Sequence, residues 1–391
     1  MHGLRVVFIT PRFWPLFGGP EDVVATLAVG LQRRGAEPTV LTAGWDPHWS
    51  PQMVYRQIPV VRLAHPGAGG WGTVRYLIAL ARWLRRHRDE IDLLYVAGLG
   101  PESLLARRVL GVRPIPIVVR PDQPDGREGR SPCRWLVRRR CQAAAAAVVP
   151  DPAAARAASA AGLPDECIYR IADGVRESVS ERASDRLAAR RALAEVNSMF
   201  SVADDAPVAV CVGRLRKGRR LPRLLEAWRP VAKRWPGARL WLIGDGPFRD
   251  PLDAYLGDLD LRLSVLLPGS FDNISDALAA ANLLVEPSAD PVSPQPLREA
   301  IALGLPVVGC HLETLQQTPA WEAGTARFAG PDETAALSRA MLDLLAQPPA
   351  ADALAAARGR VLAEYGSSRM IDEHLHLFDR LVQRCHSQRP A

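Results

Sequence analysis

The sequence alternates short runs of β-branched and other apolar residues with segments of helical periodicity. Residues 4–9 form the first apolar run, and residues 21–34 follow with apolar side chains recurring along one helical face. The later runs that we expect to form strands are 39–41, 92–96, 115–119, 146–149, 208–212, 239–243, 264–267, 283–285 and 306–308. Strand-length runs that alternate with helices are typical of parallel βα units. The chain is therefore predicted to be an α/β protein with doubly wound, Rossmann-like sheets.

A looser, charged stretch, residues 173–205, in which we expect a helix over residues 182–195, interrupts this alternation and predicts a domain boundary. The 391 residues suit two domains, at roughly 150 residues per domain. We expect an N-terminal domain over residues 1–180, a C-terminal domain over 200–365 and a last helix within about 366–391. Because ligands of open parallel sheets bind outside the carboxyl ends of the strands, we expect the site in a cleft between the two domains.

Composition excludes several classes of protein. No apolar stretch approaches the roughly 18 residues of a membrane-spanning helix, and the apolar run near the N-terminus is shorter than the core of a signal peptide. We therefore expect a cytoplasmic protein. The six cysteines form neither a CxxC pair nor a cluster with histidine at metal-ligand spacing, which indicates reduced thiols and no zinc site.

The chain is basic, with a net charge of +7, and its cations are 47 arginines and two lysines. A basic surface suits anionic phosphates, an anionic membrane face or nucleic acid. No segment resembles a nucleic-acid-binding module, so no nucleic-acid partner is expected. Peripheral contact with the inner membrane face stays open, because the arginines are spread along the whole chain and define no single patch.

The loop after the first predicted strand contains Gly18 and Gly19 and leads into a helix. Unpaired amides at a helix N-terminus can receive an anion, and adjacent glycines let a phosphate approach the backbone. An ordinary glycine-rich turn would have the same sequence, so both interpretations stay open.

A second loop concentrates positive charge after the strand 208–212. Arg214 is followed by Lys217, Arg219 and other basic residues at the start of a helix. Cations beside a helix N-terminus are unfavourable unless an anion neutralises them, and a diphosphate would do so. A solvated basic turn is the alternative.

Two more segments end strands in the second half of the chain. Gly244 and Gly246 form a tight turn suited to placing a nucleobase or ribose against bare backbone, although a purely structural turn would look the same. After a strand that ends at Glu286, a proline-broken loop leads to a helix, with Glu299 expected in its first turn. A carboxylate there would also stabilise the helix dipole.

Taken in order, these segments resemble family 4 of the retaining glycosyltransferases. The matching motifs are VGRL at 212–215, IGDGP at 243–247, LPG at 267–269, PS at 287–288, EA at 299–300 and GLPV at 304–307, with supporting matches at 18–21, 34–35 and 173–175. The resemblance covers almost the whole chain. It implies the GT-B fold, in which two Rossmann-like domains face each other across a cleft and the last helix, about 366–391, packs back on the first domain.

The same resemblance implies an activity: metal-independent transfer of a sugar from a nucleotide diphosphate sugar to a glycan or lipid-linked acceptor, with retention of configuration. Arg214 and Arg219 would hold the diphosphate, Gly19 would offer its amide to a phosphate, and Glu299 would bind the ribose hydroxyls. The residues implied to border the nucleobase are Gly244, Gly246, Pro268 and Gly269.

The sequence departs from the family pattern at the first of two glutamates that the family places eight residues apart. That position is Pro291, and proline has no carboxylate to contact the donor sugar. A carboxylate shifted along the loop, Asp290 or the more distant Glu286, is the substitute that we consider. The departure also supports a second hypothesis, a nucleotide-sugar-binding protein or scaffold with impaired catalysis. A GT-B epimerase is a third hypothesis, which fits the motif series less well.

Two further departures concern charged side chains. Arg219 stands where the family usually has lysine, so Lys217 is an alternative cation for the diphosphate. The N-terminal histidine that often faces the sugar is missing near Arg120, and Asp122 or Asp125 is a speculative substitute.

Two candidate metal motifs lie elsewhere. Asp258 and Asp260 form a DxD motif, but at the end of a predicted helix and away from the proposed site, which indicates surface charge. His374 and His376 are two residues apart on a predicted helix and so face different directions. We therefore expect no metal.

Overall fold

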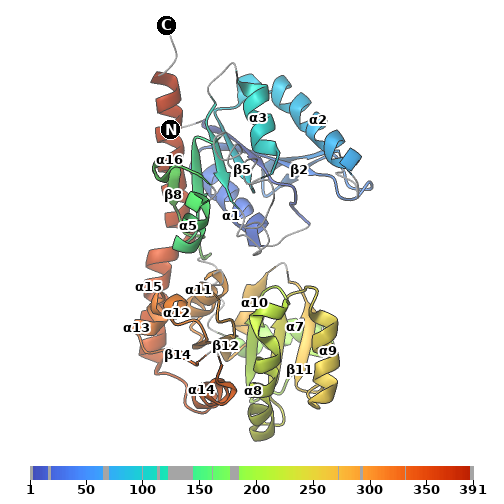
Figure 1. Cartoon of the computed structure of the whole chain (residues 1–391), viewed down its shortest axis with the longest axis vertical. Coiled ribbons are helices and arrows are strands. Elements are labelled where there is room, and N and C mark those ends of the chain that lie inside the picture. Colours follow the sequence, from blue (N-terminus) through green and yellow to red (C-terminus); the bar gives the residue numbers. More distant parts are fainter. Residues whose placement is uncertain are drawn as a thin grey trace. The chain divides into compact units, whose positions relative to one another are not determined.

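The computed structural model describes residues 3–15, 19–64, 70–98, 100–111, 115–121, 144–160, 162–176, 185–271, 273–290, 294–330 and 332–387. The chain divides into two compact units, one of Met1–Gly174 with Ser367–Ala391 and one of Val175–Gly366 (Figure 1). Each unit is an α/β domain built on one sheet. The predicted fold class is confirmed.

The first unit contains an eight-stranded sheet in the order β3-β4-β2-β1-β5-β6-β7-β8. All neighbouring strands are parallel except β3 and β4, which are antiparallel. The strands are β1 (Arg5–Ile9), β2 (Glu37–Ala43), β3 (Gln52–Tyr55), β4 (Ile58–Leu63), β5 (Leu93–Ala97), β6 (Ile117–Arg120), β7 (Ala146–Val149) and β8 (Ile168–Arg170).

Helices cover both faces of this sheet, which is why its central strands are apolar along their whole length. The helices are α1 (Gly19–Arg33), α2 (Gly70–Arg86), α3 (Glu102–Leu110), α5 (Pro152–Ala160) and α16 (Ser367–Ser387). Val6 and Phe8 of β1 belong to the core under α1 and α16, whereas Val7 and Ile9 belong to the core under α2, α3 and α5.

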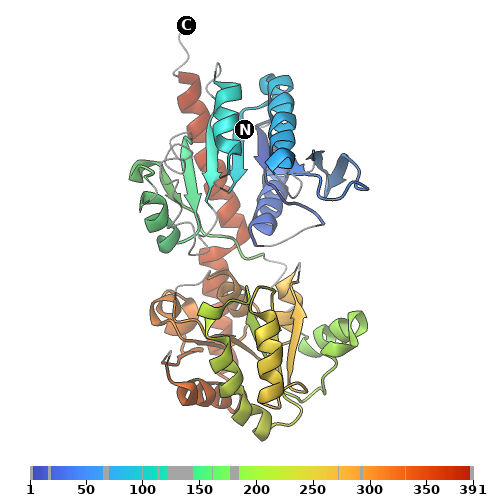
Figure 2. The same cartoon turned by 45° about the vertical axis from the view of Figure 1, so that its right-hand side comes forward.

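The last helix, α16, packs on the first unit although it lies at the end of the chain (Figure 2). Gly30 of α1 lets it approach closely, because a Cβ atom at that position would lie 2.1 Å from the Cδ1 atom of Ile371. Arg34 donates to the Asp372 carboxylate at 2.6 Å and to the Ser368 hydroxyl at 2.8 Å. These contacts fix α16 against α1.

The second unit contains a six-stranded, entirely parallel sheet in the order β11-β10-β9-β12-β13-β14. Its strands are β9 (Val208–Val212), β10 (Arg239–Ile243), β11 (Val265–Gly269), β12 (Leu283–Glu286), β13 (Val307–Gly309) and β14 (Ala326–Phe328). Its helices are α7 (Arg186–Val196), α8 (Leu221–Arg234), α9 (Arg249–Asp258), α10 (Ile274–Ala279), α11 (Gln295–Ala302), α12 (Leu312–Gln316), α13 (Pro319–Glu322), α14 (Thr334–Ala346) and α15 (Ala351–Tyr365).

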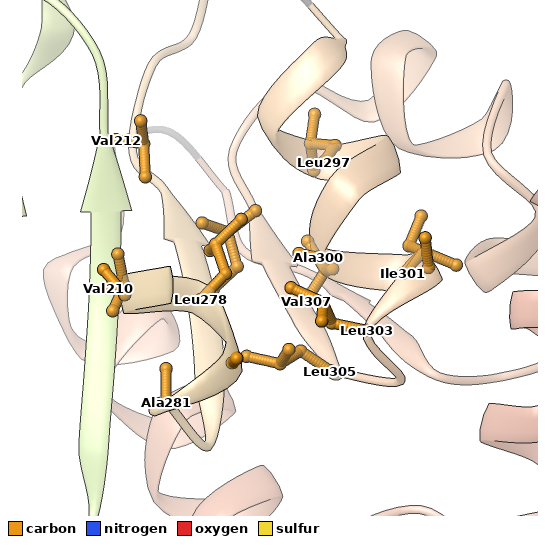
Figure 3. Close-up of a cluster of buried hydrophobic side chains, with 14 of the residues drawn as sticks. Val210, Val212, Leu278, Ala281, Leu297, Ala300, Ile301, Leu303, Leu305 and Val307 are labelled. Carbon is orange, nitrogen blue, oxygen red and sulfur yellow. The ribbon is translucent and has the colours of Figure 1, made fainter. Parts of the chain in front are cut away.

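Side chains of β9 point alternately into two cores, as the pleat of a strand requires. Val210 and Val212 join the core formed with α10, α11 and α15, while Cys211 joins the core formed with α8, α9 and α14. Figure 3 shows the first of these cores, with Leu297 and Ala300 of α11 directed toward it. One face of α11 is thus held firmly, which fixes the direction of its other side chains.

The strand order of each sheet reverses at one point. In the first unit this topological switch point lies between β1 and β5, and in the second between β9 and β12. Loops that leave the carboxyl ends of such neighbouring strands diverge to opposite faces of the sheet, and ligands of this architecture bind there. The loops after β9 and β12 therefore mark the expected position of a ligand site in the second unit.

The β3–β4 hairpin is the main element that the sequence analysis missed, together with the short strands β8 and β14. The hairpin turns at Arg56 and Gln57, which both have positive φ angles, of 46° and 70°. Such turns are usually signalled by asparagine and glycine. Neither residue is present here, so the sequence carries no turn signal.

Candidate functional site

Three loops at the carboxyl edge of the second sheet are joined by backbone hydrogen bonds. The Gly213 amide donates to the Ile243 carbonyl at 2.8 Å, and the Leu215 amide donates to the Asp245 carbonyl at 2.9 Å. The Gly244 amide donates to the Gly269 carbonyl at 2.8 Å. The loops after β9, β10 and β11 therefore form one continuous backbone surface.

Two of the predicted glycines are required by this close packing. A Cβ atom at Gly244, whose φ is +139°, would lie 2.2 Å from the Gly213 carbonyl oxygen, and one at Gly246 would lie 2.3 Å from the Leu215 carbonyl oxygen. Gly269 differs, because a Cβ atom there would meet nothing within 4 Å, although its φ of +90° favours glycine. Gly244 and Gly246 thus have a structural role that needs no ligand.

Pro268 lies at an irregularity in the pairing of β10 with β11. Trp241 pairs with Leu266 but Ile243 pairs with Gly269, so β11 carries one extra residue at this point. Proline suits such a bulge because it has no amide to donate to the ladder. The bulge leaves Pro268 and Gly269 half-buried beside the Gly244 turn.

The cations of the loop after β9 fall into two environments. Arg219 is only 4% exposed, whereas Arg214 and Lys217 are exposed. Arg220 forms an ion pair with Asp332 at 2.7 Å. The expectation that a diphosphate neutralises this basic run is therefore incomplete, because protein carboxylates neutralise part of it.

Arg219 is anchored through one nitrogen of its guanidinium group. Its Nη2 donates to the Glu286 carboxylate at 2.5 Å and to the Val212 carbonyl at 2.9 Å. Burial lowers the pKa of Arg219, but Cys211 and the Glu286 carboxylate outweigh burial, so the pKa lies above its ordinary value. Among the described residues, its Nε and Nη1 atoms have no hydrogen-bond acceptor.

Glu286 is fully engaged with neighbours in the second unit. Its Oε2 accepts the hydrogen bond from Arg219, and its Oε1 accepts one from the Ser288 amide at 3.1 Å. The side chain is buried. Glu286 is therefore a poor candidate for the shifted carboxylate that would replace a glutamate at position 291.

Asp290 is the other candidate for that carboxylate, and its side chain is exposed. Its backbone is fixed by Ser288, whose hydroxyl donates to the Asp290 carbonyl at 3.1 Å. A Cβ atom built at Gly218 would lie 4.0 Å from the Asp290 Oδ2 atom, so this carboxylate borders the loop after β9. Pro291 itself lies outside the described residues.

Glu299 is the fifth residue of α11, so the expectation that it lies in the first turn was wrong. Its carboxylate is buried and cannot act as a partner for the helix N-terminus in the way that we expected. Ser275 donates its hydroxyl hydrogen to Oε2 at 3.0 Å, and Gln295 donates from Nε2 to Oε1 at 3.1 Å. The sequence analysis missed both of these residues, which hold the carboxylate in one orientation.

In the first unit, Gly18 lies outside the described residues and Gly19 is the first residue of α1, directly after the loop that follows β1. Arg120 lies at the end of β6 and donates from Nη2 to both oxygens of Asp173, at 2.6 and 2.7 Å. Asp122 and Asp125 lie outside the described residues.

The two motifs that we assigned to structure lie where expected. Asp258 ends α9 and Asp260 follows it, both exposed, at the amino edge of the sheet rather than the carboxyl edge. His374 is buried and His376 is exposed, so they face different directions. Within the described part of the chain, no cluster of three or more histidine, cysteine or acidic side chains could hold a metal ion.

Comparison with known proteins places both halves of the chain. Residues 17–179 match the family model described as glycosyltransferase family 4, and residues 206–347 match the one described as glycosyl transferases group 1. The lipopolysaccharide core biosynthesis glycosyltransferase LpsE of Rhizobium meliloti (strain 1021) is 30% identical over 164 residues, which are 40% of this chain and 46% of that protein. The chain thus spans less than half the length of this relative.

Solved structures extend the likeness over the whole chain. Sucrose-phosphate synthase from Thermosynechococcus elongatus is 17% identical with a TM-score of 0.76, covering 97% of this chain and 99% of that one. Anabaena Alr3699/HepE, solved in complex with UDP and glucose, is also 17% identical with a TM-score of 0.72, covering 96% and 99%. At this identity the likeness defines the fold, which is GT-B.

The two α/β domains and their sheet orders therefore define a protein of the GT-B class. The N-terminal half of the chain matches a family 4 glycosyltransferase domain and its C-terminal half matches a group 1 glycosyl transferase domain, so the chain belongs to these families by sequence.

Proposed function

We propose that the chain transfers a sugar from a nucleoside diphosphate sugar to an acceptor hydroxyl, with retention of configuration and without a metal cofactor. The observation that carries the proposal is the set of loops at the switch point of the second sheet. There the exposed cations Arg214 and Lys217 follow β9, and the buried Glu299 follows β12 on α11. The group 1 family model covers this half of the chain, and the similar Anabaena protein was solved with UDP.

In this proposal the chain's own cations stabilise the leaving group. Breaking a glycosyl phosphate bond places negative charge on the departing diphosphate, and fixed positive charges lower the energy of that transition state. The backbone surface of Gly244, Gly246, Pro268 and Gly269 receives the base, and Glu299 accepts hydrogen bonds from the ribose hydroxyls.

Asp290 is the carboxylate that we assign to the donor sugar. It is exposed and borders the loop after β9, whereas the negative charge of the buried Glu286 is already neutralised by Arg219. Because Pro291 stands at the family's glutamate position, the competing hypothesis is a protein that binds a nucleotide sugar without transferring it. Asp290→Asn is then the decisive variant, since it removes the charge and keeps the shape.

The experiment combines binding with turnover. Purified protein is titrated with uridine, guanosine and adenosine diphosphate sugars, and hydrolysis or transfer is followed by release of the nucleoside diphosphate. Transfer that is abolished in Asp290→Asn while binding persists supports the enzyme. Binding of one donor without any turnover, with candidate acceptors present, favours the impaired protein. A donor affinity that is unchanged in both Arg214→Ala and Glu299→Ala contradicts the proposed site.

We propose that the acceptor is a glycan or a lipid-linked sugar. We further propose that the protein reaches this acceptor at an anionic membrane surface, to which it binds through α2. Within the described residues no helix is long and apolar enough to cross a membrane. One face of α2 instead exposes Trp71 (84%), Val74 and Ile78, with Arg75, Arg82 and Arg85 on the same face at helical spacing. The helix carries no acidic residue over its 17 positions. Apolar side chains flanked by arginine fit the interface of an anionic bilayer.

Vesicle sedimentation tests this surface. We expect the protein to bind phosphatidylglycerol vesicles but not phosphatidylcholine vesicles, and to be released by salt, which screens the charges. The paired change Trp71→Ser and Ile78→Ser should reduce binding, whereas Leu263→Ser, which changes an exposed leucine of the second unit, should not. Equal loss in both variants, or equal binding to both lipids, would contradict the proposal.

A further inference from the structure

The buried ion pair between Arg219 and Glu286 lies at the switch point of the second sheet. Arg219 follows β9 and Glu286 ends β12, and these two strands are neighbours in the sheet although the residues are 67 positions apart. Both side chains are less than a tenth exposed. The pair therefore occupies the place where the resemblance puts a free, phosphate-binding cation.

We propose that Glu286 withdraws Arg219 from donor binding, and that Lys217, together with Arg214, carries the donor's diphosphate in this protein. The Arg219–Glu286 pair acts instead as a strut that holds the loops after β9 and β12 together. This inference rests on the proposed function, because it concerns which residues bind the nucleoside diphosphate.

The guanidinium group of Arg219 is closed to an incoming phosphate. The Nε and Nη1 atoms of Arg219 are closed to solvent. Nη1 lies against Gly213, where a built Cβ atom would be 2.6 Å away. The remaining nitrogen, Nη2, already donates to Glu286 and Val212. A phosphate oxygen cannot reach Arg219 while the loop after β9 has this conformation.

Releasing Arg219 from Glu286 would cost free energy. If its side chain turned out to meet a phosphate, Glu286 would be left as a buried carboxylate without its cation. Removing one partner of a buried ion pair is strongly unfavourable, because the other charge stays desolvated and unpaired. An exposed cation in the same loop avoids this cost. Lys217 is exposed, and among the described residues it forms no ion pair or hydrogen bond through its ammonium group.

The contacts of Glu286 indicate what the Arg219–Glu286 ion pair does. Its second oxygen accepts the Ser288 amide, and the Ser288 hydroxyl donates to the Asp290 carbonyl. The chain of contacts from Arg219 through Glu286 and Ser288 thus fixes the backbone of the loop that carries Asp290. In this proposal the Arg219–Glu286 pair sets the spacing between the loops after β9 and β12, and the exposed Lys217 and Arg214 bind the diphosphate.

The test compares three variants in calorimetric titrations with UDP, GDP and ADP. We expect Lys217→Ala to weaken binding of the preferred nucleotide by about tenfold or more, as for loss of a charge-assisted contact. The matched control is Lys233→Ala, which removes the only other lysine, an exposed one at the far end of α8, and should leave affinity unchanged. The double variant Arg219→Met with Glu286→Leu replaces both charges by apolar groups, which can pack in place of the ion pair, and should keep affinity within about threefold.

The outcomes separate the inference from the proposed function. If Lys217→Ala and Lys233→Ala bind the nucleotide with the same affinity, the inference is wrong. Both lysines are exposed, so neither substitution should disturb the fold. If the folded double variant loses as much affinity as Lys217→Ala, Arg219 is a donor ligand and the inference is again wrong. If the wild-type protein binds none of the three nucleotides, the proposed function fails as well.

Discussion

His374 should make the first unit sensitive to acid. It lies on α16, is 2% exposed and packs against the rings of Tyr95 and Phe378. Its Nδ1 atom is 2.8 Å from the Met370 carbonyl oxygen, so Nδ1 carries the proton, and its Nε2 atom has no partner among the described residues. Burial, offset in part by the Met370 carbonyl and reinforced by the charge of Arg120, lowers the pKa of His374 from 6.5 to about 4.

The direction of the effect follows from proton uptake. Well above pH 6.5, His374 is unprotonated in both the folded and the unfolded chain, so it makes the free energy of unfolding no more dependent on pH. Between pH 6.5 and 4 the unfolded chain takes up a proton that the folded chain excludes, and stability falls. A pKa shift of this size corresponds to a loss of about 3 kcal/mol, because each pH unit contributes roughly 1.4 kcal/mol.

Urea unfolding at a series of pH values between 7.5 and 4 measures this loss. Carboxylates also titrate in this range, so the informative quantity is the difference between the wild type and His374→Phe, which fills the aromatic site without a titratable group. We expect His374→Phe to lose about 3 kcal/mol less than the wild type on acidification. His376→Gln, at an exposed position of the same helix, should behave like the wild type. Identical pH profiles for the wild type and His374→Phe would refute the reasoning.

Four further substitutions test the roles of single residues in the two units. Gly244→Ala should lower the free energy of unfolding by more than about 3 kcal/mol, because the new Cβ atom would clash with the backbone at Gly213. Gly269→Ala should lower it by only about 1 kcal/mol, because a Cβ atom at position 269 meets open space. Urea unfolding measures both changes. Arg120→Met should cost about 3 kcal/mol by leaving Asp173 unpaired, and a loss below 0.5 kcal/mol would show that the pair is dispensable. Ser275→Ala should weaken nucleotide binding about tenfold, since Glu299 loses the donor that orients it; calorimetry showing unchanged affinity would contradict this role.

The sequence predicted the central strands well because both sheets are covered on both faces. Strands such as β5 and β9 are buried along their whole length, so they are continuous apolar runs that differ clearly from the amphipathic helices between them. The hairpin β3–β4 lies at the sheet edge with alternating, partly polar residues, and its turn uses Arg56 and Gln57 in place of asparagine and glycine. Its register depends on pairing with β2, which a local pattern cannot reveal.

The grouping of the loops in the candidate site was predictable from the sequence, but the ion pairs and hydrogen bonds among them were not. Each strand of a parallel sheet ends at the same edge, so the residues after β9, β10 and β12 could be grouped from the sequence alone. Which carboxylate meets which cation depends on strand order. Glu286 and Arg219 meet because β12 lies beside β9, on the opposite side from β10. Similarly, Ser275 meets Glu299 because α10 and α11 pack in one core.

A role assigned to a residue through its position in a motif holds only when its surroundings are the same. A cation at position 219 can bind a phosphate if its charge is free, but here a glutamate one strand away neutralises it, and its Nε and Nη1 atoms are closed to solvent. Arg219 forms this pair through Nη2 alone, which donates both to the Glu286 carboxylate and to the Val212 carbonyl. In the proposed binding of a diphosphate, Arg219 and Glu286 therefore act as one buried pair, and the exposed Lys217 two residues before Arg219 supplies the cation.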